Sequence, residues 1–269
     1  MDPVIDLVRD DRGGVTVMVD GTPQSHVQQD DPRLLTFEYV QHLALVIDTL
    51  PPGPLAVTHV GGAGLTLPRY VNAVRPGSPQ IVLEPDTALT ELVRRELPLP
   101  RQHRIRVRPV DGATGVAALR AGSADVLVID AYAGGRVPAE LTTVAFLTAV
   151  RGVLSPDGVA LLNVADEPGL RFVARVAASL SAAGFDEVAL LATHEVLKGK
   201  RFGNTVLVAS APGAVDLATL VGQVASAPLP TGIRHGEALR RLVAGARPLT
   251  DADAAASPEA PPVGRWRVR

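Results

Sequence analysis

Residues 57–69 read "VTHVGGAGLTLPR", a short apolar run followed by three glycines within four positions and then by an amphipathic stretch. This order predicts a strand, a loop and a helix. Open α/β sheets bind ligands where a parallel strand ends and its helix begins, and Gly61, Gly62 and Gly64 would let backbone N–H groups approach a ligand closely. The stretch therefore indicates a ligand site, with a simple tight turn as the alternative.

Seven short apolar runs alternate with amphipathic stretches along the chain. They span residues 55–60, 80–84, 105–110, 124–130, 158–164, 187–193 and 204–210. Because these runs are apolar throughout, they predict strands covered by helices on both faces of a mostly parallel sheet. Only residues 194–203 separate the last two runs, so these two are expected to form an antiparallel hairpin. The arrangement is α/β and resembles the Rossmann-like, seven-stranded sheet of S-adenosylmethionine-dependent methyltransferases, with an antiparallel last strand.

Four segments of the chain are expected. Residues 1–52 predict a β-hairpin, with strands at 4–8 and 15–19, followed by a helix that Pro51 and Pro52 end. The segments that follow are a Rossmann-like nucleoside-binding domain, a helical extension and a mobile tail rich in Ala, Pro and acidic residues, and they span residues 53–211, 212–250 and 251–269.

The composition excludes several classes of function. The 269 residues carry a net charge of -2 without a dense basic stripe, so no nucleic-acid partner is expected. There is no cysteine, which excludes disulfides and thiolate chemistry, and no histidine pairing suggests a metal. No apolar run reaches the roughly 18 residues of a membrane span, and the N-terminus lacks an apolar signal core, so a soluble, cytoplasmic protein is expected.

Three acidic residues follow three of the predicted parallel strands. Glu84 can accept hydrogen bonds from ribose hydroxyls, Asp111, followed by Gly112, can meet an adenine amino group, and Asp130 ends the fourth strand of the sheet. Each acid alone is as readily a solvated strand end or a helix N-cap. Because the carboxyl ends of parallel strands share one edge of a sheet, their joint placement with the glycine loop favours a nucleoside site.

Six segments resemble the spermidine and spermine synthases, the aminopropyltransferases. They are "VMVDGTPQSHVQQDDP" (17–32), "FEYVQHL" (37–43), "GGAGL" (61–65), "VLEPD" (82–86), "VDG" (110–112) and "VIDAYAGGRVPAEL" (128–141). The similarity covers about residues 15–210, and the order of the segments is its distinctive feature. It implies the transfer of an aminopropyl group from decarboxylated S-adenosylmethionine to a polyamine nitrogen, without a metal, by a homodimer built partly through the N-terminal hairpin.

The resemblance also implies roles for single residues. Gln24 and Tyr39 would frame the donor and acceptor sites, and Asp130 would lie at the reactive end of the donor. The expected catalytic residues are Asp130 and Tyr39. The expected cofactor-binding residues are Gln24, Gly61, Gly62, Gly64, Glu84, Asp111, Gly112 and Asp130.

Two departures from the family pattern leave other functions open. Gly64 and Ala133 stand where the family has Asp residues, the second of them the presumed base. Without these acids a polycationic amine would be bound more weakly. An inward-pointing Arg136 would suit an anionic or neutral acceptor instead. The alternatives are a methyltransferase that uses S-adenosylmethionine and a non-catalytic relative that only binds a nucleoside or serves a structural role.

Overall fold

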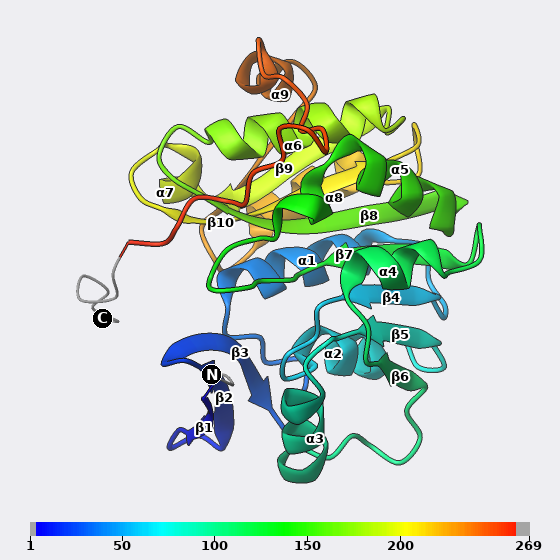
Figure 1. Ribbon diagram of the computed structural model, residues 1–269, viewed down its shortest axis with the longest axis vertical. Helices are drawn as coiled ribbons and strands as arrows, with labels where there is room; N and C mark the ends of the chain where they lie inside the picture. The colour runs from blue at the N-terminus through cyan, green and yellow to red at the C-terminus, as the bar shows by residue number, and fades with distance from the viewer. Residues whose placement is uncertain (1–3, 262–269) are drawn as a thin grey trace.

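The computed structural model describes residues 4–261, which form two β-sheets with helices packed around the larger one (Figure 1). The smaller sheet has three strands and is built by the N-terminal residues. The larger has eight strands in the order β11-β9-β10-β8-β7-β4-β5-β6. Within residues 4–261 no helix is long and apolar enough to cross a membrane.

The N-terminal sheet consists of β1 (Ile5–Arg9), β2 (Gly14–Val19) and β3 (Thr22–Gln28), all antiparallel. The first two strands are the predicted hairpin. The third was not predicted, because β3 is largely polar and buries only its middle residues. Asp20 and Gly21 join β2 to β3 with positive φ values of 48° and 73°, as tight hairpin turns require. Val15, Val17 and Val27 share a hydrophobic core with Leu89 and Val93 of α3 and with Leu65, which precedes α2.

The larger sheet confirms the prediction of an α/β fold with a mostly parallel central sheet. Its strands are β4 (Val57–Val60), β5 (Gln80–Leu83), β6 (Ile105–Arg108), β7 (Ala124–Ile129), β8 (Leu154–Asp166), β9 (Glu187–Thr193), β10 (Gly203–Ser210) and β11 (Thr231–His235). All pairings among the five strands from β4 to β8 are parallel, and β10 runs antiparallel to both β8 and β9, as expected. The sequence predicted seven strands, and β11 adds an eighth at the edge, antiparallel to β9.

Helices cover both faces of this sheet. They are α1 (Glu38–Thr49), α2 (Thr66–Val74), α3 (Thr87–Glu96), α4 (Gly112–Ala117), α5 (Val144–Val153), α6 (Arg171–Ala182), α7 (His194–Leu197), α8 (Leu217–Ser226) and α9 (Gly236–Val243), with a 3₁₀ turn η1 at Ala139–Thr142. Along β7, Leu127 and Ile129 join the core under α5 and α6, whereas Val126 and Val128 join the core under α1, α2 and α8. Burial on both faces explains why β7 is apolar from Val126 to Ile129.

The first helix is shorter than the sequence pattern suggested. The apolar spacing extends from Leu34, but α1 begins at Glu38, and Leu34 is exposed. The helix ends before Pro51 as expected. Its last carbonyl groups accept hydrogen bonds from the buried guanidinium of Arg75, which bonds to Ile47 and Leu50 and ties α1 to the end of α2.

The C-terminal segment lies against the main domain as far as it is described. Residues 251–261 fall in the tail that the sequence expected to be mobile, yet Ser257 is completely buried and hydrogen-bonded to Val137. The reason is a set of side-chain contacts that composition does not reveal. The rest of that predicted tail, residues 262–269, lies outside the described residues.

Candidate active site

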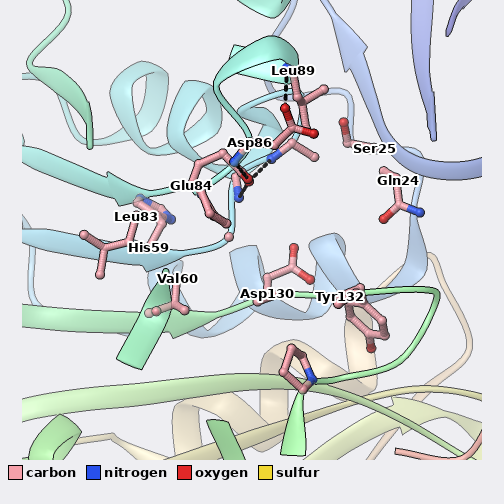
Figure 2. Close-up of a pocket in the computed structure, with 18 of the residues that line it drawn as sticks. Gln24, Ser25, His59, Val60, Leu83, Glu84, Asp86, Leu89, Asp130 and Tyr132 are labelled. Atoms are coloured by element: carbon pink, nitrogen blue, oxygen red, sulfur yellow. Dashed lines mark hydrogen bonds between the residues drawn. The ribbon is translucent and has the colours of Figure 1, made fainter. Parts of the chain in front are cut away.

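A cavity of about 590 Å³ opens at the carboxyl ends of β4, β5 and β7 and is closed on one side by the N-terminal sheet (Figure 2). This volume is typical of small-molecule sites. Most of the residues predicted from the sequence line it together: Gln24, Tyr39, Gly61, Gly62, Glu84, Asp111, Gly112 and Asp130. The edge of the parallel sheet supplies four of these stretches, and β3 and α1 add Gln24 and Tyr39.

The glycine loop follows β4 directly. Gly61 has a φ of +83°, and a Cβ atom there would strike the backbone carbonyl of Asp130. Gly62 is equally tight, since its Cβ would lie 2.6 Å from Val82 Cγ1. These two positions need glycine for close packing of β4, β5 and β7. Gly64 differs, because it is absent from the cavity lining.

Gly64 was expected to contact the cofactor, and the structure places it elsewhere. Its N–H donates to Ser25 Oγ over 2.8 Å, and a Cβ there would meet Ser25 and Val27 of β3. The cause is the third N-terminal strand, which packs over this part of the loop. Ala63 lines the cavity instead.

Glu84 fixes the conformation of the loop. Its carboxylate accepts hydrogen bonds from the backbone N–H groups of Gly62 (3.1 Å) and Ala63 (3.3 Å) and, through its other oxygen, of Asp86 (3.0 Å). Figure 2 shows Glu84 directed back towards the loop from the end of β5. A carboxylate offers about four acceptor positions, so these three bonds leave room for one more donor.

Asp111 lines the cavity, as predicted, and it also has the alternative role of a helix N-cap. It is the N-cap of α4, and its Oδ1 accepts from Thr114 N over 2.8 Å. That hydrogen bond lowers the pKa of the carboxyl below its usual value. Asp111 is exposed at the cavity wall and retains a second oxygen for a ligand.

Asp130 has the most unusual environment of the predicted acids. Figure 2 shows its carboxyl group directed into the cavity between Glu84 and Tyr132. Burial raises the pKa of Asp130 to about 6, and hydrogen bonds from Asn163 and Tyr39 partly offset this rise. The pKa of Tyr39 is raised well above its ordinary value, chiefly by burial, so its hydroxyl stays protonated. A carboxylate with a pKa near neutrality is suited to accept a proton from a substrate.

Asn163 was not predicted and supports this acid. Its Nδ2 donates to Asp130 Oδ1 over 2.9 Å from the neighbouring strand β8, and only 1% of the residue is exposed. Its Oδ1 has no hydrogen-bond partner among the described residues. The available signal was a single polar residue within the apolar run 158–164.

The cavity is strongly acidic. Six Asp or Glu residues line it, three of which the sequence reasoning missed, and none of the described residues in the lining is Lys or Arg. The acids are Asp20, Glu84, Asp86, Asp111, Asp130 and Glu140. His59 also lines the cavity, but burial lowers its pKa to about 4, so it is neutral. A wall of this composition attracts cations and repels anions.

Arg136 does not change this balance. Its Nε donates to Ser257 O over 2.5 Å and its Nη2 to Ala256 O over 3.3 Å, so the guanidinium faces the C-terminal segment. The sequence left the direction of Arg136 open, and these contacts remove the case for an anionic acceptor that an inward position would have made. Within residues 4–261 no group of three or more His, Asp or Glu side chains could hold a metal ion.

In sequence, the chain is similar to polyamine aminopropyltransferases. Polyamine aminopropyltransferases of Neisseria meningitidis and Vibrio vulnificus are each 25% identical, over 161 and 138 residues. These matches cover 58% and 51% of this chain and 60% and 46% of the relatives, so the chain matches only about half to three-fifths of their length. No family model matches the sequence.

Solved structures extend the similarity over the whole fold. A probable spermidine synthase from Corynebacterium glutamicum superimposes with a TM-score of 0.83 and 28% identity, covering 96% of both chains. Human methyltransferase-like protein 13, solved with SAH, shares the fold at a TM-score of 0.58 and 22% identity, covering 80% of this chain and 96% of the human chain. The sheet order and the cavity at its carboxyl edge therefore define a Rossmann-like protein of the methyltransferase type. Within that class, the chain resembles polyamine aminopropyltransferases in sequence and a probable spermidine synthase in structure.

Proposed function

We propose that this protein is an aminopropyltransferase that binds decarboxylated S-adenosylmethionine and transfers its aminopropyl group to an amine. The observation that carries the proposal is the lining of six carboxyl side chains without Lys or Arg among the described residues. Both proposed substrates are cations. The relatives support the same reaction, since they are named as polyamine aminopropyltransferases and a spermidine synthase.

The charge of the wall also favours one donor over the other. S-adenosylmethionine carries a carboxylate that its decarboxylated form lacks. In this cavity that carboxylate would face Asp and Glu side chains without a cationic partner, at a cost in desolvation and repulsion. The ammonium and sulfonium groups of the decarboxylated donor would be stabilised there. The acceptor must likewise be cationic or neutral, which a short polyamine satisfies.

Asp130 would act as the general base. The lone pair of a neutral acceptor nitrogen attacks the methylene carbon next to the sulfonium, the carbon–sulfur bond breaks, and its electrons neutralise the sulfur to give methylthioadenosine. The nitrogen then loses a proton to the Asp130 carboxylate, which is largely ionised above pH 7 because its pKa is about 6. Tyr39, hydrogen-bonded to Asp130, would orient that carboxylate. Gln24 lines the same cavity from β3 and would contact the donor.

The nucleoside half of the donor would lie over the glycine loop. We assign the ribose to Glu84 and the adenine to Asp111 and Gly112, with Gly61 and Gly62 allowing close approach. No metal is part of this proposal. The proposal does include a homodimer. Val8 of β1 and Val4, just before it, are each more than half exposed, and such apolar surface supports a contact between subunits. Light scattering would test the dimer, and a cytoplasmic location belongs to the same proposal.

The direct test is calorimetric titration with decarboxylated S-adenosylmethionine, S-adenosylmethionine and methylthioadenosine. We expect the decarboxylated donor to bind tighter than S-adenosylmethionine, and Glu84→Ala to weaken all three by roughly tenfold or more, as the loss of a charged hydrogen-bond acceptor predicts. Glu91→Gln, an exposed change on α3 outside the cavity lining, is the matched control. Binding of none of the three ligands would overturn the proposal.

A second candidate is a methyltransferase, favoured by one observation. Ala133 lines the cavity where the aminopropyltransferases have an acid, and methyl transfer depends more on alignment than on a second carboxylate. Tighter binding of S-adenosylmethionine than of its decarboxylated form would support this function. Tight binding of the nucleosides without turnover of any amine would instead identify a non-catalytic nucleoside-binding relative.

A further inference from the structure

One wall of the cavity is a short loop with little to hold it in place. Residues 131–135 line the cavity after β7. The loop then reverses direction through two backbone hydrogen bonds between Ala133 and Arg136, of 2.9 and 3.2 Å. Gly134 and Gly135 between them have φ values of +57° and +74°, and a Cβ at either would contact nothing within 4 Å. Because glycine has more backbone freedom than other residues, this turn depends on contacts from outside it for a fixed position.

The contacts that fix the loop come from the C-terminal segment, residues 249–257. Arg136 donates to the carbonyl groups of Ala256 and Ser257, and Val137 N donates to Ser257 Oγ over 2.9 Å. In the other direction, Ser257 N donates to Val137 O over 3.2 Å. Ser257 and Val137 are both buried. These four bonds attach the end of the loop to a segment 120 residues away.

The C-terminal segment is itself firmly anchored. Leu249 is fully buried, its N–H donates to Ser179 Oγ of α6 over 2.8 Å, and its carbonyl accepts from Val144 at the start of α5. Four residues further on, Asp253 accepts hydrogen bonds from Thr250 and forms an ion pair with Arg175 of α6, which together lower its pKa to about 2. The segment can therefore transmit the position of α5 and α6 to the loop.

We infer that residues 249–257 form a strap that positions the cavity-lining loop 131–137, with Arg136 and Ser257 as its positioning residues. The inference depends on the described contacts alone. Its effect on ligand affinity rests on the proposed function, because the loop adjoins Asp130 and forms one wall around the donor.

Trypsin provides a test that needs no ligand. The strap should protect the peptide bond between Arg136 and Val137 from trypsin, because Val137 is 1% exposed and hydrogen-bonded to Ser257. A chain that ends after Asp253 keeps the anchor to Arg175 and loses Ala256 and Ser257. We expect this truncation to raise the rate of cleavage at Arg136, measured by mass spectrometry of the fragments, by roughly tenfold or more, since several hydrogen bonds to a buried segment are lost.

Two further variants keep the test decisive. Ser257→Ala preserves the length of the chain and leaves the buried Val137 N–H without its acceptor, so it should raise the cleavage rate even if the truncated chain fails to fold. Arg240→Ala is the control. Arg240 is exposed on α9, its guanidinium pairs with Glu237 of the same helix, and its replacement should leave the rate unchanged. Unchanged cleavage at Arg136 in a folded Ser257→Ala protein would overturn the inference.

Titration with methylthioadenosine supplies the second readout. Ser257→Ala should weaken binding several-fold at temperatures where the variant is fully folded, an effect that a merely structural contact would not produce. If the unaltered protein binds no nucleoside while Ser257→Ala still accelerates cleavage at Arg136, the strap stands and the proposed function fails. If the nucleoside binds and neither readout responds to the variant, the strap is rejected alone.

Discussion

Asn163 on β8 donates a 2.9 Å hydrogen bond to Asp130 at the end of β7, across neighbouring parallel strands. The bond occupies one acceptor position of Asp130 Oδ1 and holds the carboxyl group in one orientation. It also favours the ionised carboxylate and so opposes the rise in pKa that burial causes. An apolar run with one asparagine in it thus sets both the direction and the basicity of the proposed base.

Replacing Asn163 should shift the pH dependence of the reaction. In Asn163→Leu the Asp130 carboxylate loses a hydrogen bond to its charged form, so its pKa should rise above about 6. We expect the acidic limb of the kcat/KM profile to move to higher pH while activity at alkaline pH is largely retained. Asn204→Ala, which removes only the 3.5 Å contact to Tyr132, is the comparison. An acidic limb at the same pH in Asn163→Leu would contradict this role.

Asp130→Asn should separate activity from stability. Removing the base should lower kcat by roughly 10²- to 10⁴-fold and abolish the pH limb near 6. The native carboxyl has a raised pKa, so the folded state binds more protons than the unfolded chain between pH 3.8 and about 6, and this group destabilises the fold as pH rises through that window. The variant should therefore melt at a higher temperature than the unaltered protein at pH 7.5. Equal melting temperatures at that pH would argue against a raised pKa.

Two glycines with positive φ allow a matched test of the close packing around the loop. Gly61 and Gly134 both have positive φ, but a Cβ at Gly61 meets the Asp130 carbonyl whereas one at Gly134 meets open space. Gly134→Ala should lower the free energy of unfolding by about 1 kcal/mol from backbone strain alone, and Gly61→Ala by about 3 kcal/mol or more. Chemical denaturation measures both. Similar losses in the two variants would show that the approach of Gly61 to Asp130 is unimportant.

Gly64 and Ala133 stand where the aminopropyltransferases have Asp residues. Introducing an acid should improve the proposed acceptor site at position 133 and not at position 64. The side chain of Ala133 is exposed to the cavity, so Ala133→Asp should lower the KM for a diamine by roughly tenfold through a new ion pair. Gly64→Asp would place a carboxylate against Ser25 and Val27 and should destabilise the protein instead. Steady-state kinetics and thermal denaturation measure the two effects. Improved kinetics in Gly64→Asp would mean that the loop can reorient towards the cavity.

The sequence predicted the sheet because its signal is local. Continuous apolar runs with helical stretches between them predict seven of the eight strands of the larger sheet, and the topology then brings Glu84, Asp111 and Asp130 to one edge. The strands that were missed, β3 and β11, bury few residues and so have little hydrophobic pattern. Their position depends on pairing with partners rather than on their own composition.

The direction of individual side chains was the part that could not be predicted. Gly64 was assigned to the ligand from its place in a motif, and the direction of Arg136 was left open. In the structure Gly64 packs against Ser25 and Arg136 against Ser257. In each case the competing partner lies far away in the chain, 39 and 121 residues respectively. Asp20 was missed as a cavity residue because the turn between β2 and β3 sets its position, and that turn belongs to the N-terminal sheet rather than to the main sheet.

The outward position of Arg136 has an electrostatic consequence. Its neighbour Gly135 lines a cavity with six carboxyl groups, so a guanidinium released from Ala256 and Ser257 would be a tethered cation at high effective concentration beside them. Such a group would compete with any positively charged substrate for the same acids. By keeping Arg136 occupied with carbonyl groups, the C-terminal segment leaves the acidic charge of the cavity lining unneutralised, as the proposed binding of a cationic ligand requires.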